Sequence, residues 1–79
     1  MIKVKIISPE AELFNGEVQA VFLPGTLGEF EVLDNHAPII SSLGEGLVKL
    51  RCDGKIETIK ISSGFVRTGR GEMTVCVEL

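Results

Sequence analysis

Alternation of apolar and polar residues with a period of two is the feature that most constrains how this chain folds. The first strand-like run alternates apolar residues with lysines, so that Ile2, Val4 and Ile6 share one face of an extended segment. Pro9 then ends the alternation, because proline cannot donate a hydrogen bond to a β-ladder. The same combination of a short alternating run and a turn signal recurs along the whole chain.

Turn signals separate the alternating runs at intervals of roughly eight to twelve residues, a spacing typical of sandwiches and barrels. The runs cover residues 2–7, 17–24, 29–33, 46–52, 55–61, 64–68 and 72–79. No segment has a helical period, apart from a single helical turn expected between Glu10 and Phe14. The pattern predicts one all-β domain over residues 1–79, a single antiparallel β-sandwich of short strands joined by hairpins.

The run at residues 17–24 is expected to form one strand with apolar residues on both faces. Val18, Ala20 and Phe22 are expected on one face, and the apolar residues between them thicken the other face. The Pro-Gly pair that follows is expected to end this strand as a turn.

Residues 53–54, an Asp-Gly pair, are expected to turn a β-hairpin, and two registers fit it. A two-residue turn places Leu50 opposite Glu57, whereas a three-residue loop pairs Leu50 with Ile56. We favour the three-residue loop, because it also sets Lys49 opposite Glu57 as a cross-strand charge pair.

The charge and the composition exclude some partners. A net charge of −3 argues against nucleic acid, because phosphate-binding domains carry a basic face. Trp and Tyr are absent, so no platform for stacked bases is expected. No apolar run is long enough to span a bilayer, and the alternating amino-terminal residues do not form a signal peptide. We therefore expect a cytoplasmic protein with no nucleic-acid partner.

Apolar residues make up 44% of these 79 residues, more than so small a domain is expected to bury. Five of them lie in or near expected turns: Leu13, Phe14, Leu27, Ile39 and Ile40. Some of these five are expected to form an exposed patch, which indicates a protein–protein interface. The two cysteines, Cys52 and Cys76, could form one disulfide, but we favour two small buried thiols in a reducing compartment.

His36 is the only histidine, and an enzyme built on this chain would depend on it. A hydrolytic triad could take one of four serines in residues 41–63 as its nucleophile and Asp34 as the orienting carboxylate, but no nucleophile-elbow motif surrounds any of them. One histidine and two separated cysteines match no common metal-ligand spacing. We therefore expect no catalytic residue, no metal and no cofactor, and a structural role for His36 in a loop.

Four motifs, in order, resemble those of the ε subunit of F-type ATP synthases, which is the δ subunit in mitochondria. They are Leu13-Phe14-Asn15-Gly16-Glu17-Val18, Pro24-Gly25-Thr26-Leu27-Gly28-Glu29-Phe30, His36-Ala37-Pro38 and Gly46-Leu47-Val48. Residues 61–79 resemble the segment that closes the same β-domain. The resemblance covers nearly the whole chain.

The resemblance implies a β-sandwich that carries no chemistry of its own. The family's amino-terminal domain lies at the foot of the central stalk, against the γ subunit and the c-ring, and rotation passes through this assembly to the α/β catalytic head. For this chain it implies a non-catalytic rotor subunit that couples ion translocation to ATP synthesis. Its implied location is peripheral, on the cytoplasmic face of the bacterial inner membrane.

The resemblance also assigns roles by motif position. Glu29 is expected to contact the polar loops of the c-ring, with Phe30 supporting that contact, whereas Ser8, His36 and Ser41 match positions that face γ. Two departures affect these roles. Residues 34–35 are Asp-Asn where the family usually has Pro-Gly, and Glu31 replaces a usual glycine, which adds a charge beside Glu29 and favours solvent exposure or a basic partner.

Most family members continue into a two-helix carboxy-terminal domain, which in some blocks rotation and in some binds ATP. If Leu79 is the natural end, the chain is expected not to inhibit ATP hydrolysis; if it is a piece of a longer protein, only its regulatory half is missing. Two alternatives stay open. One is a free-standing β-sandwich binding module with the same fold, and the other is a small hydrolase that uses His36 and a serine.

Overall fold

Short alternating runs become strands along almost the whole chain. The computed structural model describes residues 1–34 and 37–79, and within these residues it contains strands and no helix. The strands are β1 (Ile2–Ile7), β2 (Glu12–Val18), β3 (Ala20–Gly25), β4 (Gly28–Leu33), β5 (Ile40–Leu43), β6 (Gly46–Cys52), β7 (Lys55–Ile61), β8 (Ser63–Gly69) and β9 (Glu72–Glu78). The predicted all-β sandwich is confirmed.

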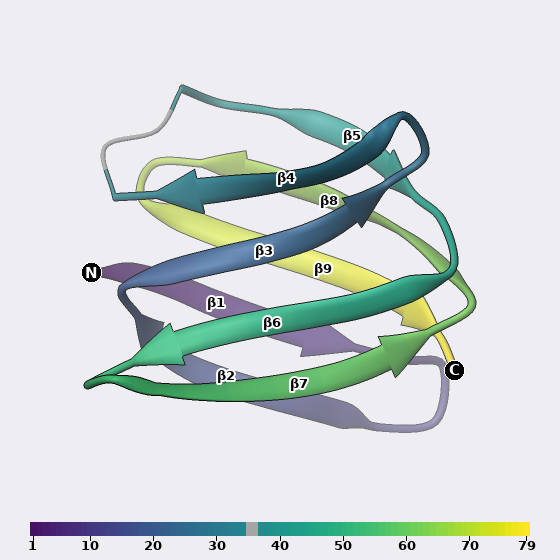
Figure 1. Ribbon diagram of the computed structural model, residues 1–79, viewed down its shortest axis with the longest axis horizontal. Helices are drawn as coiled ribbons and strands as arrows, with labels where there is room; N and C mark the ends of the chain where they lie inside the picture. Colours follow the sequence, from purple (N-terminus) through teal and green to yellow (C-terminus); the bar gives the residue numbers. More distant parts are fainter. Residues whose placement is uncertain (35–36) are drawn as a thin grey trace.

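The strands form one sheet that curls into two facing layers (Figure 1). Its order is β2-β1-β9-β8-β5-β3-β6-β7, with β4 beside β3. In Figure 1 the strands β1, β2 and β9 lie behind β3, β6 and β7. Every pair is antiparallel except β1 with β9, which places Ile7 opposite Cys76 in parallel register. A parallel pair needs a long crossover, and the seven strands between β1 and β9 supply it.

The core lies between the two layers and is built from the inward positions of nearly every strand. In β1 the side chains of Ile2, Val4 and Ile6 are buried and the two lysines between them are exposed, as the alternation predicts. The fully or almost fully buried set is Ile2, Val4, Ile6, Val18, Val21, Leu23, Val32, Leu43, Val48, Leu50, Ile61, Val66, Met73, Val75 and Val77. Burial of each large apolar side chain contributes about 1.5–3 kcal/mol.

The segment that follows β1 differs from the prediction. Residues 8–11 form a tight turn, in which the N–H of Ser8 donates to the carbonyl of Ala11 over 2.8 Å. The chain then continues as β2, so the helical turn expected between Glu10 and Phe14 is wrong. Pairing decides this, because β2 hydrogen-bonds along β1 with Ile6 opposite Phe14. A ladder of backbone hydrogen bonds outweighs the weak local preference of a five-residue segment.

The run at residues 17–24 is also not one strand. It breaks at Gln19, where the chain passes from the rear layer to the front layer, and the N–H of Gln19 donates to the carbonyl of Arg51 over 2.8 Å. The break resets the alternation, so that Val21 and Leu23 face the core while Phe22 is half-buried. Ala20 and Phe22 share one face of β3 as expected, but Val18 belongs to β2, so the expectation of one continuous strand through all three residues is wrong.

The β6–β7 hairpin has the register that we did not favour. Cys52 lies opposite Lys55, which leaves a two-residue turn, and Leu50 lies opposite Glu57. Asp53 and Gly54 both have positive φ, 52° and 77°, the combination that a two-residue hairpin turn requires. Backbone conformation therefore outweighs the expected pairing of Lys49 with Glu57, and Lys49 lies opposite Thr58 instead.

Cys52 and Cys76 are both free, half-buried thiols, so the disulfide alternative is wrong. They lie on strands that do not pair with each other. The pKa of the Cys52 thiol is raised, first by burial and then by the charge of Asp53. This shift favours the protonated thiol over the nucleophilic thiolate.

Candidate docking surface

The β3–β4 hairpin carries the longest of the motifs, and its turn lies beside the end of β5 (Figure 1). Thr26 and Leu27 form its two-residue turn, because Gly25 pairs with Gly28. Gly28 has a φ of 130°, which side chains rarely adopt. The side chain of Leu27 is completely exposed at the tip. The hairpin therefore presents an apolar residue to the solvent.

Hydrogen bonds to β5 and to the segment after it hold this tip in place. The N–H of Gly44 donates to the carbonyl of Pro24 over 2.8 Å. The N–H of Thr26 donates to the carbonyl of Ser42 over 3.4 Å, and the two hydroxyl groups of these residues lie 3.3 Å apart. Because these contacts come from outside the hairpin, they fix the position of its tip relative to the body of the domain.

The aromatic ring of Phe30 packs against the backbone of the hairpin at Gly25. The ring lies so close to Gly25 that a Cβ added there would be 2.8 Å from Cε1 of the ring and 2.7 Å from the carbonyl oxygen of Gly28. The ring is half-buried and packs against the core. The ring therefore lies between the hairpin and the core, and a role for Phe30 beside the c-ring stays a prediction.

Glu29 lies on the outer face of β4, next to this tip. Its carboxylate oxygen Oε2 is 3.4 Å from Nζ of Lys49 on β6, and the two side chains are 55% and 37% exposed. Glu31, two residues further along β4, is exposed on the same face. The sequence did not predict Lys49 at this site, because the expected hairpin register paired it with Glu57.

A hollow of about 370 Å³ brings three of the predicted site residues together. Its lining is Gly25, Thr26, Leu27, Gly28, Glu29, Phe30 and Ser41. Glu29 and Phe30 come from β4, whereas Ser41 comes from β5. The resemblance assigned Ser41 to a different partner from the other two, and the structure places all three on one continuous surface.

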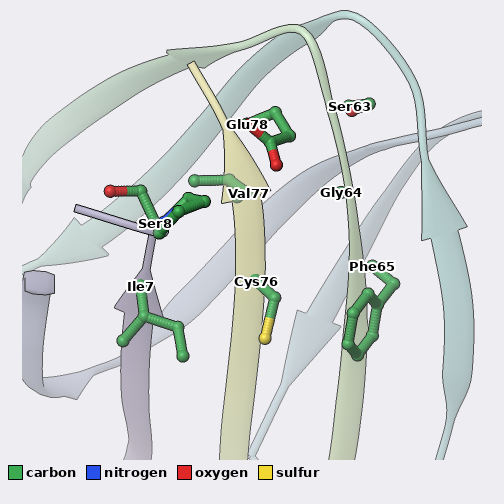
Figure 2. Close-up of a pocket in the computed structure, with 9 residues that line it drawn as sticks. Ile7, Ser8, Ser63, Gly64, Phe65, Cys76, Val77 and Glu78 are labelled. Carbon is green, nitrogen blue, oxygen red and sulfur yellow. The ribbon is translucent and has the colours of Figure 1, made fainter. Parts of the chain in front are cut away.

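Ser8 lies apart from that hollow, at a larger one of about 450 Å³ (Figure 2). Ile7, Cys76 and Phe65 form a row across β1, β9 and β8, since Cys76 pairs with both of the others. Phe65 is half exposed. The complete lining is Ile7, Ser8, Pro9, Ser63, Gly64, Phe65, Cys76, Val77 and Glu78. This hollow is mostly apolar, with polar groups at its rim.

The hydroxyl of Ser8 has a structural role in the turn after β1. Its Oγ donates to the carbonyl of Ala11 and accepts from the N–H of Ala11, both over 3.2 Å. Such a reciprocal contact closes the turn that directs the chain into β2. Ser8 therefore shapes the rim of the hollow in Figure 2 as well as lining it.

His36, the third residue predicted to face γ, lies outside the described residues together with Asn35. On one side of them the carboxylate of Asp34 accepts a hydrogen bond from the amino-terminal ammonium of Met1 over 2.8 Å, and this contact raises the pKa of that ammonium. On the other side, the N–H of Ile39 donates to Oγ1 of Thr68 over 2.8 Å. Thr68 is a buried polar residue that sequence analysis missed, and its signal was a threonine at an inward position of an alternating strand.

Two of the five apolar residues near turns are exposed, as expected for some of them, and the other three are not. Leu13, Phe14 and Ile39 are half-buried and pack against the core. Leu27, in the turn between β3 and β4, and Ile40, the first residue of β5, are exposed. In residues 1–34 and 37–79, no group of acidic, cysteine or histidine side chains could hold a metal ion, and no helix could cross a membrane.

The amino-acid sequence was compared with protein families and with proteins of known function. The family described as the β-sandwich domain of the ATP synthase delta/epsilon chain matches residues 1–79. The ATP synthase epsilon chain of Leptospira interrogans is 35% identical over 77 residues, which are 98% of this chain and 61% of that protein. The ATP synthase epsilon chain of Caulobacter vibrioides is 40% identical over 73 residues, which are 92% of this chain and 85% of that protein.

Two solved structures share the fold. A chain of the Euglena gracilis mitochondrial ATP synthase, in an assembly of OSCP, F1 and c-ring, matches with a TM-score of 0.89, 23% identity and coverage of 96% of this chain and 49% of that one. A chain of the Tetrahymena thermophila central stalk and c-ring matches with a TM-score of 0.84, 13% identity and coverage of 99% and 63%. This chain spans about 60% of the length of the Leptospira relative.

Proposed function

Because the chain belongs to the family of ATP synthase delta/epsilon β-sandwich domains, we propose that it is the ε-type subunit of an F-type ATP synthase rotor. In this role it is not an enzyme. It connects the γ subunit to the c-ring and helps to couple ion translocation to ATP synthesis in the α/β catalytic head. The observation that carries this proposal is the family match over residues 1–79, together with relatives that are named epsilon chains.

The β3–β4 hairpin is the surface that we assign to the polar loops of the c-ring. It is rigid, because β5 and the segment after it hold its tip through backbone hydrogen bonds. It also places Leu27, which is fully exposed, next to the carboxylate of Glu29. A rigid element that presents an apolar side chain beside a charge loses little entropy on binding, which suits a permanent contact in a rotor.

The hollow that contains Ser8 is the surface that we assign to γ. Its floor is the apolar row of Ile7, Cys76 and Phe65, which is suited to a large apolar side chain from a partner. Ser41 lines the hollow that we assign to the c-ring, so its predicted contact with γ requires γ to reach that hollow as well. His36 remains a predicted γ contact.

In this proposal the chain is held at the membrane through its partners, on the cytoplasmic face of a bacterial inner membrane. We also expect the 79-residue chain to leave ATP hydrolysis unchanged when it is added to a complex of γ and the α/β head. Its described residues form only the sandwich and contain no helix that could enter the head. Strong inhibition that ATP relieves would contradict this expectation.

The test is reconstitution of the chain with γ and a detergent-solubilised c-ring, followed by gel filtration. We expect the chain to elute with both partners. Glu29→Gln should weaken the contact with the c-ring and spare the contact with γ. The matched control is Glu57→Gln, an exposed residue of the edge strand β7 that lines neither hollow. Failure of the unmodified chain to bind either partner would reject the rotor role and favour a free-standing binding module.

A further inference from the structure

Lys49 lies in a row of outward-facing residues that crosses three strands. On β3, Phe22 pairs with Glu31 of β4 on one side and with Lys49 of β6 on the other. Directly paired residues of neighbouring strands point to the same face of a sheet. Glu29 is two residues before Glu31, so its side chain shares this outer face as well.

The lysine reaches diagonally across β3 to the hairpin. Its Nζ is 3.4 Å from Oε2 of Glu29, although β4 and β6 are not neighbours in the sheet. β4 pairs only with β3, so it is an edge strand. The ion pair connects the beginning of β4 to β6. In the described residues, no donor reaches the other oxygen of Glu29, Oε1.

From this geometry we propose that Lys49 is a positioning residue for the docking surface. It holds Glu29 over β3, so that Oε1 faces outward for an N–H or O–H donor on the polar c-ring loop. This inference rests on the proposed function, because it assigns a purpose to the Glu29 carboxylate that only a partner can use. It goes beyond the family resemblance, which concerns Glu29 and not Lys49.

Electrostatics explains why such a group is needed in this chain. Glu31 introduces a second carboxylate on the face where the first one must be presented, and like charges repel each other. Without Lys49, the long side chain of Glu29 would turn away from Glu31 and sample several rotamers. With Lys49, the carboxylate nearer to the tip is compensated and oriented before the partner arrives.

The test is a double-mutant cycle on binding to a detergent-solubilised complex of γ and the c-ring. The variants are Glu29→Gln, Lys49→Met, which keeps the apolar stem, and the double variant. We expect each single substitution to weaken binding by about two- to fivefold. The double variant should bind no more weakly than Glu29→Gln alone, because Lys49 acts through Glu29.

Three controls separate positioning from general effects of charge and stability. Lys49→Arg restores the cation and should bind like the unmodified chain. Lys60→Met removes an equal charge from the same outer face, opposite Leu47, and should not change binding. The urea midpoints of Lys49→Met and Lys60→Met should agree, because an exposed ion pair contributes little to folding.

Each opposite result overturns a defined statement. If Lys49→Met binds as well as Lys60→Met while Glu29→Gln binds weakly, or if the two single effects add in the double variant, Lys49 is not a positioning residue. If Glu29→Gln is harmless in a chain that binds, both this inference and the assignment of Glu29 fail, but the subunit role stands. If the unmodified chain does not bind the complex, the proposed function itself fails.

Discussion

At Gly25 the backbone of the β3–β4 hairpin passes so close to its surroundings that no side chain fits. An added Cβ would lie 2.7 Å from the carbonyl oxygen of Gly28 and 2.8 Å from the ring of Phe30. Only the ring could move, and it is held against the core. The close packing of the hairpin backbone against the ring of Phe30 therefore depends on a glycine at position 25.

We expect Gly25→Ala to lower the free energy of unfolding by about 1–3 kcal/mol, because it forces the backbone or the ring to shift. Urea denaturation followed by circular dichroism measures this. Gly69→Ala is the matched control, since a Cβ there meets nothing within 4 Å. Equal stability of the two variants would contradict this prediction, because it would mean that the hairpin accommodates a Cβ at position 25.

Thr68 is the buried polar residue that connects β8 to the segment before β5. Its side-chain oxygen accepts from the N–H of Ile39 over 2.8 Å, and its own N–H donates to the carbonyl of Ile39 over 2.9 Å. The residue is only 6% exposed. The pair of hydrogen bonds anchors the segment that precedes β5.

Replacing Thr68 by Val keeps the shape of the side chain but leaves the N–H of Ile39 without this acceptor. We expect a loss of about 1–3 kcal/mol in the free energy of unfolding. Thr68→Ser should recover most of it, and Thr58→Val, at an exposed position of β7, should cost little. Chemical denaturation of the four proteins would decide, and a fully stable Thr68→Val would mean that water replaces the hydroxyl.

At the scale of the elements, the β8–β9 hairpin has a turn with one favourable and one unfavourable residue. Gly69 pairs with Glu72, which leaves Arg70 and Gly71 as a two-residue turn. Both have positive φ, 55° and 75°. The glycine adopts this conformation without strain, whereas an arginine does so only at a cost. The β6–β7 turn has the same geometry, but with Asp, which tolerates it better.

Arg70→Asn should therefore stabilise the chain by about 0.5–1 kcal/mol, because asparagine is preferred at the first position of such a turn. The matched control is Asp53→Asn, which should change stability very little. Thermal unfolding followed by circular dichroism compares the two variants with the unmodified chain. A lower midpoint for Arg70→Asn would show that the arginine side chain makes a stabilising contact of its own.

At the scale of the whole molecule, the two hollows lie on different parts of the curled sheet. One is formed by β3, β4 and β5, and the other by β1, β8 and β9 together with the turn after β1. A small domain with two separate surfaces can contact two partners at the same time. This arrangement supports the proposal of a subunit that connects γ to the c-ring.

Phe65→Glu should weaken binding to γ by at least about tenfold, since it places a charge in the apolar hollow. Leu47→Glu, on β6 in the opposite layer, is the control, because Leu47 is exposed to a similar extent, 41% against 50% for Phe65. Co-elution with purified γ measures binding, and thermal midpoints confirm that both variants fold. Equal binding of the two variants would contradict the assignment of γ to this hollow.

The sequence by itself determined the class of fold, most strands and the inward face of β1. The reason is local: alternation with a period of two orients the side chains of a strand wherever that strand lies in the sheet. The same local reasoning identified the β3–β4 motif, with Glu29 and Phe30, through the resemblance.

Only the tertiary structure decided the pairings between distant segments. Apart from proline, all residue types offer the same backbone hydrogen bonds. Alternation therefore cannot show that β1 lies parallel to β9 or that the chain changes layer at Gln19. For the same reason the sequence paired Lys49 with Glu57 within a hairpin, whereas in the folded chain it reaches across β3 to Glu29. The partner of a long charged side chain depends on which strands are neighbours, and that is a property of the whole sheet.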